Sequence, residues 1–106
     1  MARYLIEASY SSDGMKGVIA KGGVARREAV EKMLSDLGGH VVSFDFAFGD
    51  RDALVICEVP DNVSAAAVGM TVAASGMASA KTTVLLTPEE IDRAAQLSVS
   101  YRPPGS

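Results

Sequence analysis

Few residues of this chain have a type and spacing that could support catalysis. The chain contains one histidine, His40, and one cysteine, Cys57, so it cannot supply a closed zinc site made of His and Cys ligands. We therefore expect no metal site and no bound cofactor. Proton transfer needs a positioned base, and the candidate catalytic residues are His40, Asp45 and Asp52. His40 also fits the simpler interpretation of an exposed polar residue at the start of a strand.

The basic residues of the N-terminal half suggest a different chemistry. Lys16 and Lys21 precede Arg26 and Arg27, which lie near the start of a predicted helix. Helix N-termini attract anions because their backbone N–H groups are unpaired. The nearby glycines match neither a dinucleotide-binding nor a phosphate-loop motif. The cluster therefore indicates either a site for a small anion or an ordinary solvated helix face.

A charged turn adds further candidates. Residues 49–52 read Gly-Asp-Arg-Asp, which suits either a solvated hairpin turn or the polar rim of a pocket. Tyrosine hydroxyls can donate hydrogen bonds to a ligand or lie at the edge of the core. The candidate ligand-binding residues are Lys16, Arg26, Gly49, Asp52 and Tyr10.

The elements that position these residues follow from hydrophobic periodicity and from turn residues. We expect strands at 3–10, 40–48, 53–59 and 78–86, a short helix before residues 21–23, and helices at 24–37, 63–75 and after 87. The order β-α-β-β-α-β is the split βαβ, ferredoxin-like arrangement. The predicted class is α+β: a four-stranded antiparallel sheet with two main helices on one face, plus a C-terminal helix.

Several local signals refine these elements. Asp13 and Asp61 are expected to be N-caps, and the run Thr87-Pro88-Glu89-Glu90 is a strong helix start. Alternation places Glu7 opposite Lys81 across the two neighbouring strands. Alternation also predicts one shared face for the apolar residues of the second strand, Val42, Phe44, Phe46 and Phe48.

One face of this sheet has no helix assigned to it. The strand at 53–59 is apolar on both faces apart from Glu58, and such a strand needs a cover on both sides. We therefore expect a homo-oligomer, a dimer or higher, formed through the open sheet face.

Composition excludes other classes of protein. The 106 residues are 48% apolar and 22% charged, which is typical of a globular chain, and the net charge is −3. No basic stripe indicates nucleic-acid binding, and no apolar run is long enough to span a membrane. With one cysteine and no leader-like N-terminus, we expect a cytoplasmic location. We expect one domain over 1–106, with 99–106 as an extended tail.

The order and spacing of several short segments resemble the GYD domain family. They are Asp13-Gly14-Met15-Lys16, Arg26 or Arg27, Leu37-Gly38-Gly39, Phe48-Gly49-Asp50-Arg51-Asp52, Val55-Ile56 and Val59-Pro60-Asp61. The resemblance implies a ferredoxin-like fold related to dimeric α+β barrel proteins. Gly49 and Asp52 match the family's element, whereas Arg51 stands where the family has an aromatic residue, so a role that depends on that phenol is not expected here.

Three functions remain open. The first is a homo-oligomer that binds a small anionic or aromatic metabolite between sheet and helices or at a subunit interface, with Lys16, Arg26 and Asp52 as polar anchors. The second, drawn from wider relatives of the fold, is a cofactor-free monooxygenase or isomerase. The third is a structural or regulatory oligomer without a ligand.

Overall fold

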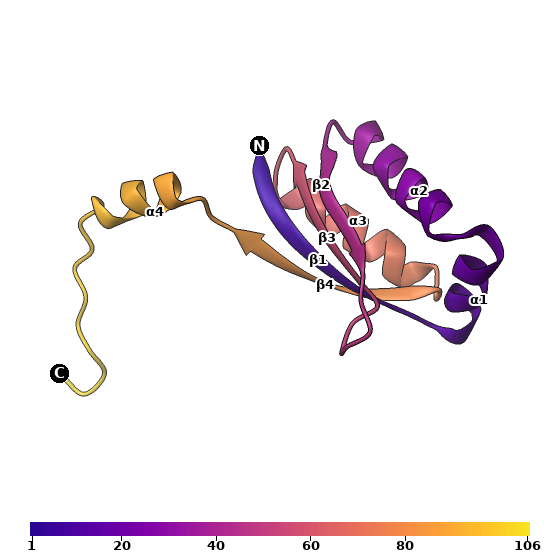
Figure 1. Cartoon of the computed structure of the whole chain (residues 1–106). Coiled ribbons are helices and arrows are strands. Elements are labelled where there is room, and N and C mark those ends of the chain that lie inside the picture. The colour runs from indigo at the N-terminus through magenta and orange to yellow at the C-terminus, as the bar shows by residue number, and fades with distance from the viewer.

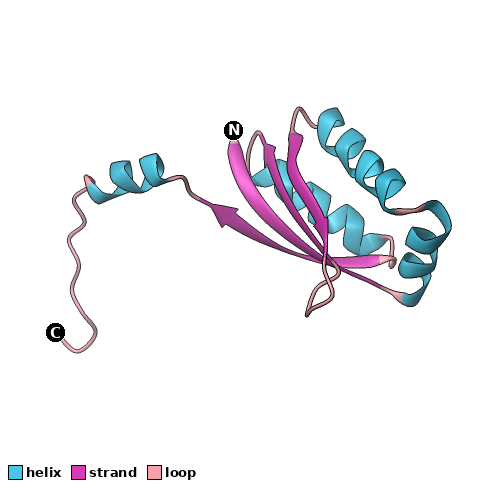
Figure 2. Ribbon diagram, in the orientation of Figure 1, coloured by secondary structure: helices cyan, strands magenta, loops and turns pink.

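A computed structural model describes all residues of the chain, 1–106, as an antiparallel sheet with helices packed against one face (Figures 1 and 2). The strand order is β2-β3-β1-β4, and each neighbouring pair is antiparallel. This order confirms the predicted ferredoxin-like α+β fold. The elements are β1 (Ala2–Tyr10), α1 (Ser12–Lys21), α2 (Gly23–Asp36), β2 (His40–Phe46), β3 (Ala53–Val59), α3 (Asn62–Ala74), β4 (Ala78–Leu85) and α4 (Pro88–Ala95).

The core lies between the sheet and the helices α2 and α3. Every second residue of β3 is buried there, because a strand's side chains alternate between its two faces. Leu34 of α2 is completely buried, and Tyr4 of β1 donates a hydrogen bond from its hydroxyl to Oδ1 of Asn62. The buried cluster consists of Tyr4, Leu34, Val55, Cys57, Val59, Ala65 and Val68.

The second strand departs from the prediction. A β-bulge between Val41 and Ser43 shifts the pairing, so that Val41 lies opposite Cys57 and Phe44 lies opposite Val55. The extra residue, Val42, is 45% exposed instead of sharing a face with Phe44. Phe44 and Phe46 share the helix side of the sheet, as predicted, opposite Val55 and Ala53. The expectation is wrong for Val42, because the bulge inserts a residue and interrupts the alternation there, and for Phe48, which lies beyond the strand.

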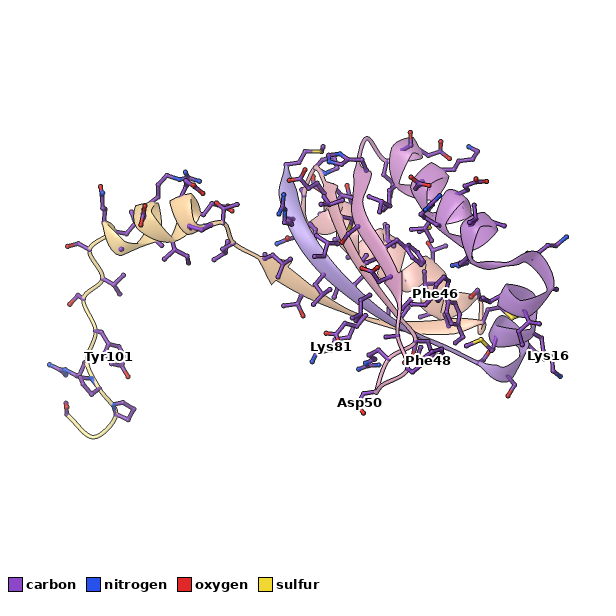
Figure 3. The ribbon with its side chains drawn as sticks, in the orientation of Figure 1. Lys16, Phe46, Phe48, Asp50, Lys81 and Tyr101 are labelled. Atoms are coloured by element: carbon purple, nitrogen blue, oxygen red, sulfur yellow. The ribbon has the colours of Figure 1, made fainter.

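Two further corrections concern element ends. The N-cap of α1 is Ser11, whose hydroxyl accepts a hydrogen bond from the Gly14 N–H, and Asp13 lies in the first turn. The strand β2 ends at Phe46, and Phe48 lies fully exposed in the following turn (Figure 3). The predicted caps Asp61 and Thr87 are both confirmed, as their side chains accept hydrogen bonds from the backbone.

The face of the sheet opposite the helices is bare, and the register orders its side chains in rows. In the first row, Glu58 lies between the basic side chains of His40 and Arg3. Its carboxylate is 2.9 Å from Nε2 of His40 and 3.7 Å from Nε of Arg3. In the next row Leu5 lies opposite Ile56 on one side and Thr83 on the other, and Ser43 lies beyond Ile56. Glu7 lies opposite Lys81 in the register, as predicted. We call this surface the open face; it comprises Arg3, Leu5, Glu7, His40, Ser43, Asp45, Leu54, Ile56, Glu58, Lys81, Thr83 and Leu85.

The free thiol of Cys57 is buried on the helix side of β3. Burial, and to a lesser degree the charge of Glu58, raises the pKa of this thiol, so it is protonated near neutral pH. Since the thiolate is the reactive form, we expect iodoacetamide to alkylate the folded protein at least about tenfold more slowly than the urea-unfolded chain. Mass spectrometry of timed samples measures both rates, and equal rates would contradict the burial described here.

Candidate ligand-binding site

A cavity of about 610 Å³ opens between α1, α2 and α3 at the end of the sheet where β1 finishes and β4 begins. Half of its lining residues are hydrophobic. The volume falls within the range of roughly 300–1,000 Å³ that is usual for small-molecule sites. The lining residues are Tyr10, Asp13, Gly14, Gly17, Val18, Lys21, Gly22, Ala25, Arg26, Ala29, Met33, Thr71, Val72, Ser75, Met77 and Ala78.

Arg26 is the principal polar group of this wall. Its guanidinium carbon lies 6.0 Å from the centre of the Tyr10 ring, within the range of a cation–π contact. The Nε of Arg26 is buried and has no hydrogen-bond partner in the protein. A buried donor without a partner costs free energy, so this guanidinium is available to donate a hydrogen bond to an oxygen of a ligand.

The start of α2 reinforces the positive charge at the same wall. Gly22 is the N-cap of α2 and offers no side-chain acceptor, and the first turn contains no acidic residue. The N–H groups of that turn are therefore uncapped, and they carry the positive end of the helix dipole. Lys21 and Arg26 are the basic residues of the cavity lining and Asp13 is its acidic residue, so the lining carries a net positive charge.

Asp52, in the turn after β2, holds the backbone of Tyr10 in place. The carboxylate of Asp52 accepts a hydrogen bond of 2.8 Å from the Tyr10 N–H, and the Asp52 N–H donates to the Ala8 carbonyl. These two bonds tie the turn after β2 to the end of β1. A second, smaller cavity of about 40 Å³ adjoins Tyr10 and Arg26 and reaches Val55 and Leu34 in the core. The apolar end of the site therefore extends towards the core.

The start of α1 closes the cavity beside β4. The Ser11 N–H and hydroxyl both donate to the Met77 carbonyl oxygen. Gly14 approaches the same carbonyl so closely that a Cβ at position 14 would lie 1.9 Å from its oxygen. Only glycine permits this approach, because any side chain would collide with rigid backbone. The turn into α2 is made by Gly22, whose φ of 89° favours glycine.

The structure brings together two of the predicted ligand-binding residues, Tyr10 and Arg26. Lys16 is exposed and points away from the protein on the outer side of α1 (Figure 3). Gly49 lies in the exposed turn between β2 and β3, with no atom near its Cβ position. Asp52 does not line the cavity and acts on it only through Tyr10.

The candidate catalytic residues do not converge. His40 pairs with Glu58 at the first row of the open face, and Asp45 lies exposed on β2. Asp52 is occupied by the Tyr10 N–H at the other end of the sheet. Arg51 lies with its guanidinium 3.4 Å from the Ser9 hydroxyl.

The chain offers no group of three or more His, Cys, Asp or Glu side chains placed to hold a metal ion. None of its helices has the length and apolar character to cross a membrane.

The sequence places Lys21 in the basic cluster but not among the selected ligand-binding residues, although helical periodicity contains the signal. Gly14, Val18 and Lys21 recur at intervals of three or four residues, so they share one face of α1, and that face borders the cavity. Lys16 falls on a different face. The contribution of Met77 depends on the contact between α1 and β4, which no local pattern reveals.

Comparison with known proteins identifies the family. The model of the GYD domain family matches residues 4–95, which include every residue that lines the cavity. No curated protein and no solved structure is significantly similar to the chain. A match over this share of the sequence, with the fold described above, shows that the chain belongs to the GYD domain family.

Proposed function

We propose that this protein binds a small organic anion with an apolar body in the cavity between α1, α2 and α3. The observation that carries the proposal is Arg26, whose buried Nε lacks a partner at the wall of a largely apolar cavity. A carboxylate there would accept hydrogen bonds from the guanidinium. Charge-assisted bonds of this kind are among the strongest in proteins.

The rest of the lining supports an amphipathic ligand over a compact, fully hydrated anion. Val18, Ala29, Met33 and Val72 surround the space next to Arg26. Burial of apolar ligand surface against such side chains is favourable by about 25 cal/mol per Å². The uncapped N-terminus of α2 and Lys21 favour negative charge at the same end. These features support a monocarboxylate with an aliphatic or aromatic tail.

The test is a titration with matched charged and neutral probes. Octanoate and phenylacetate are compared with octanol and 2-phenylethanol by ¹H–¹⁵N NMR of the full chain. We expect saturable shifts for both acids at Tyr10, Gly22, Arg26 and Met77, and weaker binding of both alcohols. Shifts that stay linear with concentration, that map elsewhere, or that are equal for acids and alcohols would contradict the proposal.

We also propose that the open face is covered by a second copy of this chain. Leu54 is 36% exposed there, and Leu5 and Ile56 beside it are only partly covered by their neighbours. The whole chain, including the segment after β4 that projects from the body, exposes 7269 Å², whereas a compact protein of 11.0 kDa exposes roughly 5,600 Å². The excess is about twice the roughly 800 Å² per partner of a standard interface, so the open face and this segment together leave enough area for a partner.

A further inference from the structure

The chain beyond β4 forms an arm that leaves the body of the protein. We call residues 86–106 the C-terminal arm; it contains α4 and a non-helical tail. The arm extends away from the sheet, on the side opposite α1 and α2, and Tyr101 lies far from the body (Figures 1 and 3). The radius of gyration is 16.9 Å, whereas a compact domain of this length has roughly 13 Å. The arm is therefore not folded back on its own chain.

The helix of the arm is nevertheless well specified. The Thr87 hydroxyl accepts from the Glu90 N–H at 3.1 Å, and the Glu90 carboxylate accepts from the Thr87 N–H at 2.9 Å. Pro88 occupies the first turn and Arg93 the last, both favourable positions. A helix of eight residues is marginal in water without a surface to pack on. The arrangement indicates a helix that becomes stable when its apolar side is covered.

That apolar side has no partner within the chain. Ile91 is 51% exposed, and Leu97, just after the helix, is 73% exposed. Helical spacing places Ile91 beside Ala95 and leaves Asp92 and Gln96 on the polar side. The arm also exposes Leu86, Val99 and Tyr101.

We infer that the C-terminal arm packs its apolar side on the body of a second copy of this chain, so that two copies exchange arms reciprocally. The inference rests on the proposed pairing through the open face. The arm continues directly from Leu85, which lies opposite Arg3 at the edge of that face. A copy seated on the open face would lie on the same side of the sheet as the arm, within its reach.

The charges of α4 favour a protein surface over a lipid surface. Its polar side carries Glu89 and Asp92 against the single base Arg93, whereas helices that bind anionic membranes are rich in Lys and Arg. The surface left bare on the chain is of the size that an obligate dimer buries. A second copy is present at equal concentration and offers the matching bare surface.

The test compares two single-charge variants of the full chain by sedimentation velocity over a concentration series. Ile91→Lys places a charge on the apolar side of α4, and Gln96→Lys places the same charge on the polar side. We expect the native chain to dimerise, Ile91→Lys to raise the dimer Kd about tenfold or more, and Gln96→Lys to leave it within about twofold. Isotope-filtered NMR of a mixed labelled dimer should detect contacts from Ile91 to the other copy.

The possible outcomes distinguish a failure of the arm exchange from a failure of the pairing through the open face. A native chain that stays monomeric at about 100 µM, where a dimer of micromolar Kd would be almost fully formed, overturns both the pairing and the arm exchange. If the native chain dimerises and both variants keep the native Kd, or both raise the Kd equally, the arm exchange alone is overturned. Contacts of Ile91 confined to its own chain also overturn it.

Discussion

Replacing Arg26 with methionine should weaken the binding of octanoate roughly 10- to 100-fold, the loss expected when a charged hydrogen-bonding partner is removed. Methionine keeps an unbranched apolar chain, so packing against the wall of the cavity is largely retained, whereas the cation–π contact with the Tyr10 ring is lost with the charge. The guanidinium is what the variant loses. Isothermal titration calorimetry with octanoate and octanol measures the effect, and the preference for the acid should disappear with the charge.

Matched controls separate the site from general electrostatics. Arg27 follows on the same helix, but its guanidinium pairs with Glu31, with Nε 3.5 Å from the carboxylate, and it does not line the cavity. We expect Arg27→Met and Lys16→Met to bind octanoate within about twofold of the native chain, because screened surface charges act weakly. Equal losses for Arg26→Met and Arg27→Met would show that the affinity depends on overall charge and not on the cavity.

The predictability of the fold varies with the range of the interaction that specifies it. The capping box of α4 and the N-cap Asp61 are local, since each needs only a side chain and a backbone N–H three residues away. The alternation of β3 is also readable in a seven-residue segment. The bulge at Val42 cannot be read from a local segment, because it is set by how β2 pairs with β3 across the hairpin.

The same distinction explains the site. Arg26 and Tyr10 could be selected from residue type, but their 6.0 Å contact depends on the tertiary arrangement that brings the start of α2 near the end of β1. Lys16 and Lys21 are the same residue type on the same helix. Only the face of α1 on which each lies distinguishes them, because Lys21 lines the cavity and Lys16 does not. Asp52 is a third case. Its residue type and place in the charged turn predict ligand binding, whereas its carboxylate accepts a hydrogen bond from the Tyr10 N–H.

Replacing Leu5 with lysine should dissociate the proposed dimer. Leu5 lies on the central strand β1 in the middle of the open face, opposite Ile56 and Thr83. The variant removes an apolar contact and places a charge at the centre of the proposed interface, where the second copy would exclude water, so we expect the dimer Kd to rise about 100-fold or more. In the separated chain the new lysine faces water, so the monomer should keep its native circular dichroism spectrum.

The matched control for Leu5→Lys is Val63→Lys, the same type of change on α3, where Val63 is 78% exposed on the helix side. Sedimentation velocity should give the native Kd for this control. Leu54→Lys, one strand away on the open face, should act as Leu5→Lys does. If Leu5→Lys and Leu54→Lys both dimerise as the native chain does, the second copy does not sit on this face, and the exposed apolar side chains of Leu5, Leu54 and Ile56 need another explanation.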